Sequence, residues 1–333
     1  MRGVSSVKLK TPVAARKKTV QPAAEQLVEL NRAAGDTLRQ NILQLLARES
    51  FAVLELSRIL DVAQPALSHH LKLLLSAGLL TRRREGTSLF YRRALHHETH
   101  PDLLRGLFSS IDQLPADPSQ QLAIDAIHAE RRSRSQAFFS ANAEALTEQS
   151  TLISNPDTYA EAADELLRQA ACGRDHALEV GPGEGQLLTL LANRFDRVTG
   201  IDSAETMLGR AQQRVGDAPN IRLQLRDFAE LPPRRVFDAV AAAMVLHHQP
   251  SPLAFMQQAF SVLRPNGVLI LVELCRHDQK WVKEVCGDFW LGFEPDELIH
   301  WGERAGFTAP DSQYLTQNNG FQVQLHAFAK PNS

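Results

Sequence analysis

The feature that most constrains this chain is a glycine-rich loop, LEVGPGEG at 178–185, which joins an apolar strand to a helix. It places Gly181, Gly183 and Gly185 at alternate positions directly after the strand predicted at 176–181. Glycine lets the backbone turn sharply and approach a ligand closely. A strand, such a loop and a helix, in this order, open a nucleotide-binding α/β sheet. The C-terminal half is therefore expected to hold a nucleotide-like ligand.

Strands and helices alternate from this loop to the end of the chain. The candidate strands are 176–181, 197–202, 221–227, 237–245, 267–274 and 321–329. Helical segments between them predict an α/β fold with a mostly parallel, doubly wound, Rossmann-like sheet. The last strand follows a helix, and we expect it to be an antiparallel edge strand.

The residues around the loop indicate which class of nucleotide-like ligand it binds. A dinucleotide loop of the form GxGxxG needs glycine where Gln186 stands, and no lysine follows as in a phosphate-binding loop. Glu179 would repel a pyrophosphate but suits a ligand with an ammonium group and a positive sulfur. Asp202 ends the next strand and can accept hydrogen bonds from two ribose hydroxyls. Asp227 and Phe228 follow a further strand, where an acid can hold an adenine amino group beside an aromatic ring.

The segment 176–330 resembles class I methyltransferases in several motifs that occur in the correct order: ALEVGPGEGQLL, GIDSAETML, RDFAEL and LRPNGVLILVEL. The resemblance implies that this part binds S-adenosylmethionine or S-adenosylhomocysteine. The expected ligand contacts are Glu179, Gly181, Gly183, Gly185, Asp202, Met207, Asp227, Phe228 and Val245. His247 and His248 follow the fourth strand and are candidate catalytic bases for an oxygen or nitrogen acceptor. Alternatively, one of them packs beneath that strand.

The N-terminal third has a different pattern and the opposite charge. Residues 1–115 hold 17 Lys and Arg against 10 Asp and Glu, a net charge of +7, whereas the remainder holds 19 against 28, a net charge of −9. Helices are predicted at 36–47, 53–60, 63–78 and 101–113, and two short strands within 79–93 flank a turn at 85–87. This order describes a winged helix-turn-helix, and the basic charge suits DNA. On periodicity alone, a helical protein-interaction module is the alternative.

The run SHHLKLLLSAGLLTRRREGTSLFYR at 68–92 resembles the recognition helix and wing of the ArsR/SmtB repressors. The resemblance covers roughly residues 30–113 and implies a homodimer that binds an inverted repeat of double-stranded DNA. Outward side chains of the recognition helix are expected to read base edges, and arginines of the wing to meet phosphates. These residues are Gln64, Ser68, His69, Lys72, Arg82, Arg83 and Arg84.

No metal site is predicted. The three cysteines of the chain follow no regular spacing, and the helix before the recognition helix, where many ArsR-type repressors bind metal, contains none. Four side chains before the next helix could bind zinc only if a partner chain completed the coordination sphere: His96, His97, Glu98 and His100. A polar turn at the start of that helix is the simpler interpretation.

Beyond its first residues the chain resembles a family that fuses an ArsR-type repressor to a methyltransferase domain. We expect a disordered basic arm at 1–24, a winged-helix DNA-binding and dimerisation domain at 25–115, a helical linker and cap at 116–175, and a methyltransferase domain at 176–333. The favoured hypothesis is a transcriptional regulator whose adenosyl ligand is the effector for methionine-cycle genes, as in some relatives. The alternative is an active methyltransferase on a small molecule, with a DNA-binding module that controls its own operon. No apolar run is long enough for a membrane span, and we expect a cytoplasmic protein.

Overall fold

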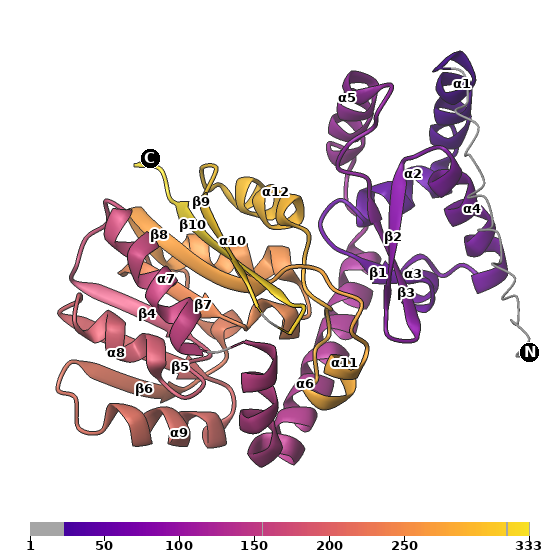
Figure 1. The fold of residues 1–333 in the computed structure, drawn as a ribbon. Helices are drawn as coiled ribbons and strands as arrows, with labels where there is room; N and C mark the ends of the chain where they lie inside the picture. Colours follow the sequence, from indigo (N-terminus) through magenta and orange to yellow (C-terminus); the bar gives the residue numbers. More distant parts are fainter. Residues whose placement is uncertain (1–22, 155, 318, 333) are drawn as a thin grey trace, which may run out of the picture.

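The computed structural model describes residues 23–154, 156–317 and 319–332 and contains two β-sheets, each with its own helices (Figure 1). The basic arm expected at 1–24 lies outside the described residues, except for its last two positions, which begin helix α1. Among the described residues, no helix is long and apolar enough to cross a membrane.

The N-terminal half packs five helices on a three-stranded antiparallel sheet of order β1-β3-β2. Its elements are α1 (Ala23–Ala34), α2 (Thr37–Leu45), β1 (Phe51–Ala52), α3 (Val53–Leu60), α4 (Gln64–Ser76), β2 (Leu80–Glu85), β3 (Ser88–Arg93) and α5 (Pro101–Asp112). Leu67, Leu71 and Leu74 of α4 are buried, as their helical spacing predicts. Asp61 takes a left-handed conformation (φ 51°) that ends α3 and permits the tight turn into α4. The winged helix-turn-helix is therefore confirmed, and the short strand β1 adds to the predicted hairpin.

Two helices lead from the winged helix to the second sheet. α6 (Pro118–Ile153) has 36 residues, and α7 (Pro156–Gln169) follows it. Each begins at a proline, whose missing N–H is harmless in a first helical turn. α6 contacts both α3 of the winged helix and α9 of the second half, and it lies between the two halves in Figure 1.

The C-terminal half is built on a seven-stranded sheet of order β6-β5-β4-β7-β8-β10-β9. Its elements are β4 (His176–Val180), α8 (Gln186–Ala192), β5 (Arg197–Asp202), α9 (Glu205–Val215), β6 (Ile221–Leu225), η1 (Phe228–Glu230), β7 (Phe237–Ala243), η2 (Leu246–His248), α10 (Pro252–Val262), β8 (Leu263–Leu274), α11 (Trp281–Val285), α12 (Pro295–Ala305), β9 (Asp311–Thr316) and β10 (Gln322–Ala329). Strands β4 to β8 are parallel, so the predicted Rossmann-like fold is confirmed.

Both faces of this sheet are covered by helices, because successive side chains of each strand point to opposite faces. Ala177 packs with α7, α8 and α9 on one face, whereas Leu178 packs with α10 and α12 on the other. The order reverses at β4, whose neighbours β5 and β7 follow it on either side. A crevice for a ligand is expected outside the carboxyl ends of these three strands.

The far edge of the sheet differs from the sequence prediction. The strand expected at 321–329 is antiparallel, as β10, but it pairs with β8 on one side and with β9 on the other. β9 is therefore the edge strand. Its sequence, DSQYLT, is polar and largely exposed, so it lacks the apolar run or alternation by which strands are found in a sequence.

Candidate functional site

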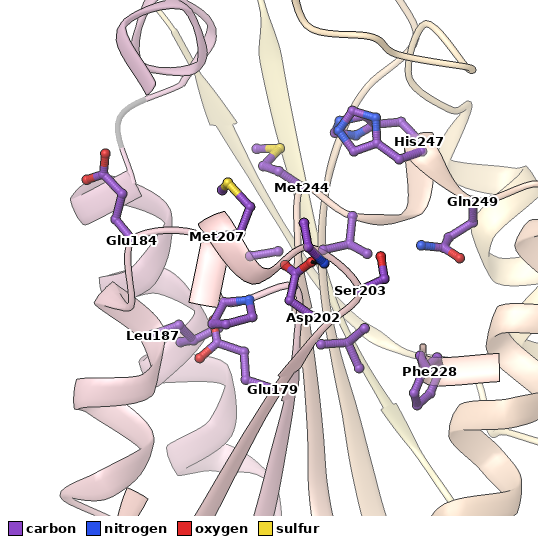
Figure 2. Close-up of a pocket in the computed structure, with 18 of the residues that line it drawn as sticks. Glu179, Glu184, Leu187, Asp202, Ser203, Met207, Phe228, Met244, His247 and Gln249 are labelled. Carbon is purple, nitrogen blue, oxygen red and sulfur yellow. Dashed lines mark hydrogen bonds between the residues drawn. The ribbon is translucent and has the colours of Figure 1, made fainter. Parts of the chain in front are cut away.

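A cavity of about 500 Å³ lies at the carboxyl ends of β4, β5 and β7 (Figure 2). Its wall on the sheet side contains the glycine loop, the end of β5, and the segments that follow β6 and β7. Ser135 and Gln136 of α6 and Tyr159 of α7 also line it, and the sequence patterns singled out none of these three. The volume is that of a small-molecule site.

The three loop glycines have different roles, although all take positive φ angles. A Cβ on Gly181 would lie 2.6 Å from Cγ2 of Val245, so this glycine allows the loop to pass close to the end of β7. A Cβ on Gly183 would meet nothing within 4 Å, and this residue lines the cavity. Gly185 caps α8 and faces Ala211 of α9, where a Cβ would lie 3.3 Å from the backbone oxygen. Gly185 therefore allows two helices to approach each other and is not among the residues that line the cavity.

Glu179 is the buried acid of the site. It lies in β4, is 2% exposed and lines the cavity, and its Oε2 has no hydrogen-bond partner among the residues that the structure describes. Burial raises its pKa well above the usual value. An unsatisfied buried carboxylate oxygen is costly unless a donor reaches it. An ammonium group in the cavity would supply that donor, so this residue fits the amino-acid end of an adenosyl ligand.

Asp202 stands at the end of β5 beside the cavity. Burial raises its pKa to about 6, against the opposing effect of hydrogen bonds from the backbone of Ala204 and Ser203. The bond from the Ala204 N–H to Oδ1 measures 2.8 Å and fixes the carboxylate. Glu179, Asp202 and Met207 of α9 all line the cavity (Figure 2).

The other predicted ligand contacts also line the cavity: Asp227, Phe228 and Val245. Oδ1 of Asp227 accepts a hydrogen bond of 2.9 Å from the Ala229 N–H and so begins the short helix η1. The Phe228 ring is buried and packs on Phe255 with ring centroids 4.8 Å apart. An acid next to a fixed aromatic ring can hold a purine, so these residues fit an adenosyl group.

His247 lies in η2, where the segment after β7 turns back over the cavity. Its Nδ1 is 2.6 Å from Oε1 of Glu273, and its backbone N–H donates to Oε2 of the same carboxylate at 3.0 Å. Nε2 lies 3.7 Å from Oδ1 of Asp288. Burial alone would lower the pKa of His247, but Glu273 and Asp288 outweigh it and raise the pKa to about 9.

His248 and Asp288 complete this group of titratable side chains. The rings of His247 and His248 meet edge to face with centroids 4.0 Å apart. Burial, followed by the charge of His247, lowers the pKa of His248 well below its usual value. Burial also raises the pKa of Asp288 to about 7, although His247 opposes the shift. Both histidines line the cavity.

The sequence patterns missed Glu273 and Asp288. Glu273 was detectable as the single charge in the apolar strand GVLILVEL, since a charge at such a position needs a partner. Asp288 lies in the segment 275–307, which contains three tryptophans. None of the tryptophans is among the described residues that line the cavity, and Trp290 packs instead against the winged helix.

The second candidate site is the outer face of α4. Gln64, Ser68, His69 and Lys72 are exposed on it, as expected for a helix that enters a DNA groove. Arg82 and Arg84 of β2 are exposed as well.

Arg83 is not on this face, and its prediction as a phosphate contact is wrong. Its side chain is 4% exposed and forms ion pairs with Glu85 and with Glu297 of α12. The guanidinium also lies over the Trp290 ring, 5.0 Å from its centroid. Alternation along a strand explains the error, since Arg83 must point away from the face that carries Arg82 and Arg84. The signal was present in the sequence, but three consecutive arginines suggested one basic surface.

The histidines before α5 are held by hydrogen bonds within the polypeptide. His97 Nδ1 accepts the backbone N–H of His100 at 3.2 Å, and His100 Nε2 lies 3.0 Å from the carbonyl oxygen of Ala23. Among the described residues, the side chains grouped closely enough to hold a metal ion are His247, His248 and Asp288.

The two folds and their sites define a protein in which a winged-helix DNA-binding module and a Rossmann-like methyltransferase fold share one chain. Comparison with family models agrees: residues 36–82 match "Bacterial regulatory protein, arsR family", and residues 178–271 match "Methyltransferase domain". The chain therefore joins an arsR-family DNA-binding domain to a methyltransferase domain.

Curated relatives resemble the C-terminal half. The chain is 30% identical over 158 residues to the ubiquinone biosynthesis O-methyltransferase of Pseudomonas aeruginosa, which corresponds to 42% of this chain and 68% of that enzyme. It is 32% identical over 142 residues to the tRNA U34 carboxymethyltransferase of Pseudoalteromonas atlantica, and it spans 44% of that protein's length. Among solved structures, the N-methyltransferase NodS of Bradyrhizobium japonicum, in complex with S-adenosyl-L-homocysteine, matches 56% of this chain and 98% of its own at 20% identity and a TM-score of 0.44.

Proposed function

We propose that this protein is a DNA-binding transcriptional regulator whose methyltransferase-fold domain binds S-adenosylmethionine or S-adenosylhomocysteine as an effector, and that it controls methionine-cycle genes. In this proposal, residues 25–115 form the DNA-binding and dimerisation domain, 116–175 the linker and cap, and 176–333 the ligand domain. A homodimer presents two copies of α4 to an inverted repeat of double-stranded DNA, because two-fold symmetry in the protein calls for two-fold symmetry in the operator.

The observation that carries this proposal is a short segment, 286–291, which belongs both to the ligand cavity and to the contact with the wing. Asp288 lines the cavity. Three residues later, the Leu291 N–H donates a hydrogen bond of 2.8 Å to Oε2 of Glu85 in β2. A displacement of the cavity wall is thus passed to the wing through three peptide units.

A ring contact with the wing and two backbone hydrogen bonds to His247 hold the same segment. The Trp290 ring meets Phe90 of β3 edge to face with centroids 5.0 Å apart. The backbone N–H groups of Phe289 and Trp290 both donate to the carbonyl oxygen of His247 at 3.0 Å. The segment therefore contacts the wing through the Trp290 ring and the Leu291 N–H, and it contacts the cavity wall through Asp288 and through the backbone hydrogen bonds to His247.

Arg131 of α6 provides a second connection between the halves. Its buried guanidinium forms a salt bridge of 2.6 Å to Glu55 in α3 and donates to the carbonyl oxygen of Pro250, beyond η2, at 2.7 Å. A ligand alters DNA binding only if it has different affinities for the two conformations of the dimer. The 286–291 segment and Arg131 connect the ligand domain to the winged helix, and through them ligand binding can favour one conformation of the winged helix over another.

The test measures DNA affinity of the full-length protein with and without each adenosyl ligand. The DNA is a duplex recovered by selection from a random library, and binding is followed by fluorescence anisotropy. We expect at least about a fivefold change in Kd with one of the two ligands. The matched control is Asp202→Asn, which removes the proposed ribose contact far from DNA and should lose the response while it keeps DNA affinity. Unchanged Kd with both ligands, at concentrations that calorimetry shows to be saturating, contradicts the proposal.

A second function is supported by one feature of the cavity, the pair formed by His247 and Glu273. A histidine held by a carboxylate at Nδ1 can take a proton from an acceptor through Nε2 once the ring is neutral, which the raised pKa of His247, about 9, places at alkaline pH. S-adenosylmethionine supplies an electrophilic methyl group, and a small-molecule acceptor aligned beside His247 would receive it. Incubation with a labelled methyl donor and a small-molecule extract tests this alternative. A labelled product that His247→Gln abolishes supports it, and the absence of any labelled product refutes it.

A further inference from the structure

Three side chains of the cavity lie together beyond the residues assigned to the adenosyl ligand: His247, His248 and Asp288. One potential ligand atom from each lies within 4.8 Å of those of the other two. His247 and Asp288 are almost completely buried, at 4% and 1% exposure. His248 is partly exposed, and all three residues line the cavity.

The carboxylate of Asp288 is the first observation that points to a missing partner. Within the described part of the chain, neither of its oxygens has a hydrogen-bond partner, and its ion pair with His247 Nε2 spans 3.7 Å. A buried carboxylate without donors is strongly disfavoured. A cation between Asp288 and the two rings would remove that cost.

The second observation is that one ring nitrogen of each histidine is already held by another group of the protein. Nδ1 of His247 is 2.6 Å from the carboxylate of Glu273, and a ring nitrogen of His248 hydrogen-bonds to the backbone at Gly287. Metal-binding histidines almost always use one ring nitrogen for a carboxylate or carbonyl in this way, which fixes the tautomer and directs the other nitrogen at the ion. Glu273 is itself held by the backbone N–H groups of His247 and Leu274.

The donor set defines the class of cation. Two imidazoles and one carboxylate suit Zn²⁺, Co²⁺ or Ni²⁺ and do not suit Ca²⁺ or Mg²⁺, which prefer oxygen ligands. Bonds of about 2.1 Å to a tetrahedral ion separate the ligand atoms by about 3.4 Å. The 3.7 Å between His247 Nε2 and Asp288 Oδ1 is close to that separation, and the other pairs lie within 4.8 Å, so side-chain rotations would bring the three ligand atoms to the ion.

We propose that His247, His248 and Asp288 bind one divalent transition-metal ion of the zinc class, with Glu273 and the Gly287 backbone as outer partners. Three protein ligands leave a coordination position open toward the cavity, as in sites where the metal meets a small molecule. The site goes beyond the proposed function: it is a second ligand site in the same cavity, and metal binding to it does not depend on whether an adenosyl compound is an effector.

The experiment titrates the full-length, chelator-treated protein with Zn²⁺ by calorimetry and with Co²⁺ by visible absorption. We expect one equivalent of metal per chain and cobalt d–d bands of a low-coordinate site. Asp288→Asn and His248→Gln should each weaken binding by at least about tenfold. Asp288→Asn keeps the shape of the side chain, and circular dichroism with a thermal melt verifies that each variant is folded.

The matched control is the double variant His97→Ala/His100→Ala, which removes the other group of histidines and should leave metal binding unchanged. The proposal is overturned if the wild type binds less than one equivalent, or if binding persists in Asp288→Asn and His248→Gln but is lost in the control. Binding of S-adenosylhomocysteine, measured separately on metal-free protein, tests the proposed function independently of this result.

Discussion

Replacement of Arg83 by methionine separates two roles for the arginines of the wing. Methionine keeps a long side chain at this buried position and removes the charge that pairs with Glu85 and Glu297 and lies over the Trp290 ring. Arg82→Met is the matched control, because Arg82 is its neighbour in the same strand and is exposed. We expect Arg83→Met to lower the stability of the fold, and Arg82→Met to lower DNA affinity without any effect on stability.

The size of the effect follows from the partners that remain. Loss of one member of a buried ion pair costs about 3–5 kcal/mol. Glu297 keeps a second partner in Arg92, and Glu85 keeps the hydrogen bond from the Leu291 N–H, so the low end of that range applies. About 3 kcal/mol at roughly 2 °C per kcal/mol for a chain of this size gives a fall in Tm of about 6 °C.

Differential scanning fluorimetry measures the Tm, and fluorescence anisotropy with a DNA duplex measures the affinity. The reasoning is refuted if Arg83→Met melts at the wild-type temperature and weakens DNA binding as much as Arg82→Met does. That result would mean that Arg83 leaves its buried position to reach a phosphate.

Three further predictions concern the ligand cavity and the DNA face. The affinity for S-adenosylhomocysteine should fall as the pH drops below about 6, the raised pKa of Asp202, because ribose hydroxyls bind the ionised carboxylate best; calorimetry should show no such fall in Asp202→Asn. Gly181→Ala should lower both Tm and ligand affinity, because its Cβ meets Val245 at 2.6 Å, whereas Gly183→Ala should lower ligand affinity with a smaller change in Tm. Lys72→Ala should weaken DNA binding by about 1–3 kcal/mol and relax the sequence preference at the base pair that Lys72 reads from the outer face of α4.

Each of these predictions has an outcome that contradicts it. If the affinity of Asp202→Asn for S-adenosylhomocysteine still falls below about pH 6, the pH dependence belongs to another group. Equal Tm values for the two glycine variants would mean that the close approach to Val245 is unimportant. A loss of stability in Lys72→Ala would show that this exposed side chain supports the fold of α4.

In the ligand-free protein, Asp202 should make the stability of the fold decrease as the pH rises, the opposite sense to its effect on ligand affinity. Its pKa in the folded state, about 6, lies above the ordinary value of 3.8. The contribution of Asp202 to stability is therefore fully present below pH 3.8 and is lost as the pH rises toward 6. A bound ligand that donates hydrogen bonds to the carboxylate compensates for this loss at neutral pH.

The sequence predicted those parts of the fold and site that depend on local patterns. The glycine loop, Asp202 and Asp227 are found because each follows an apolar strand, and parallel strands bring their carboxyl ends to one edge. The edge strand β9 was missed because an exposed polar strand carries no such pattern. Arg83 was misassigned because three consecutive arginines suggested one basic surface; the alternation of the strand places it on the other face, but only the tertiary structure identifies its partner Glu297, 214 residues away.

The partners of His247 illustrate the same limit at the cavity. His247 was found at the end of a strand, but Asp288 joins it from a segment without regular structure, and no spacing rule relates the two. Glu273 was within reach of sequence reasoning, since a lone acid in a buried strand requires a partner. The identity of that partner was not, because it depends on the register of β7 against β8.

The shared segment 286–291 has a consequence for the exchange of domains between proteins of this kind. Fusions are commonly treated as independent modules joined by a linker, but here the contact with the wing is encoded in the loop between β8 and α12. A chimaera that joins this winged helix to a foreign methyltransferase domain would lose the hydrogen bond from Leu291 to Glu85 and the ring contact of Trp290 with Phe90, even with α6 intact. A working hybrid must therefore carry the wing and the 286–291 loop as a pair, although 200 residues of sequence separate them.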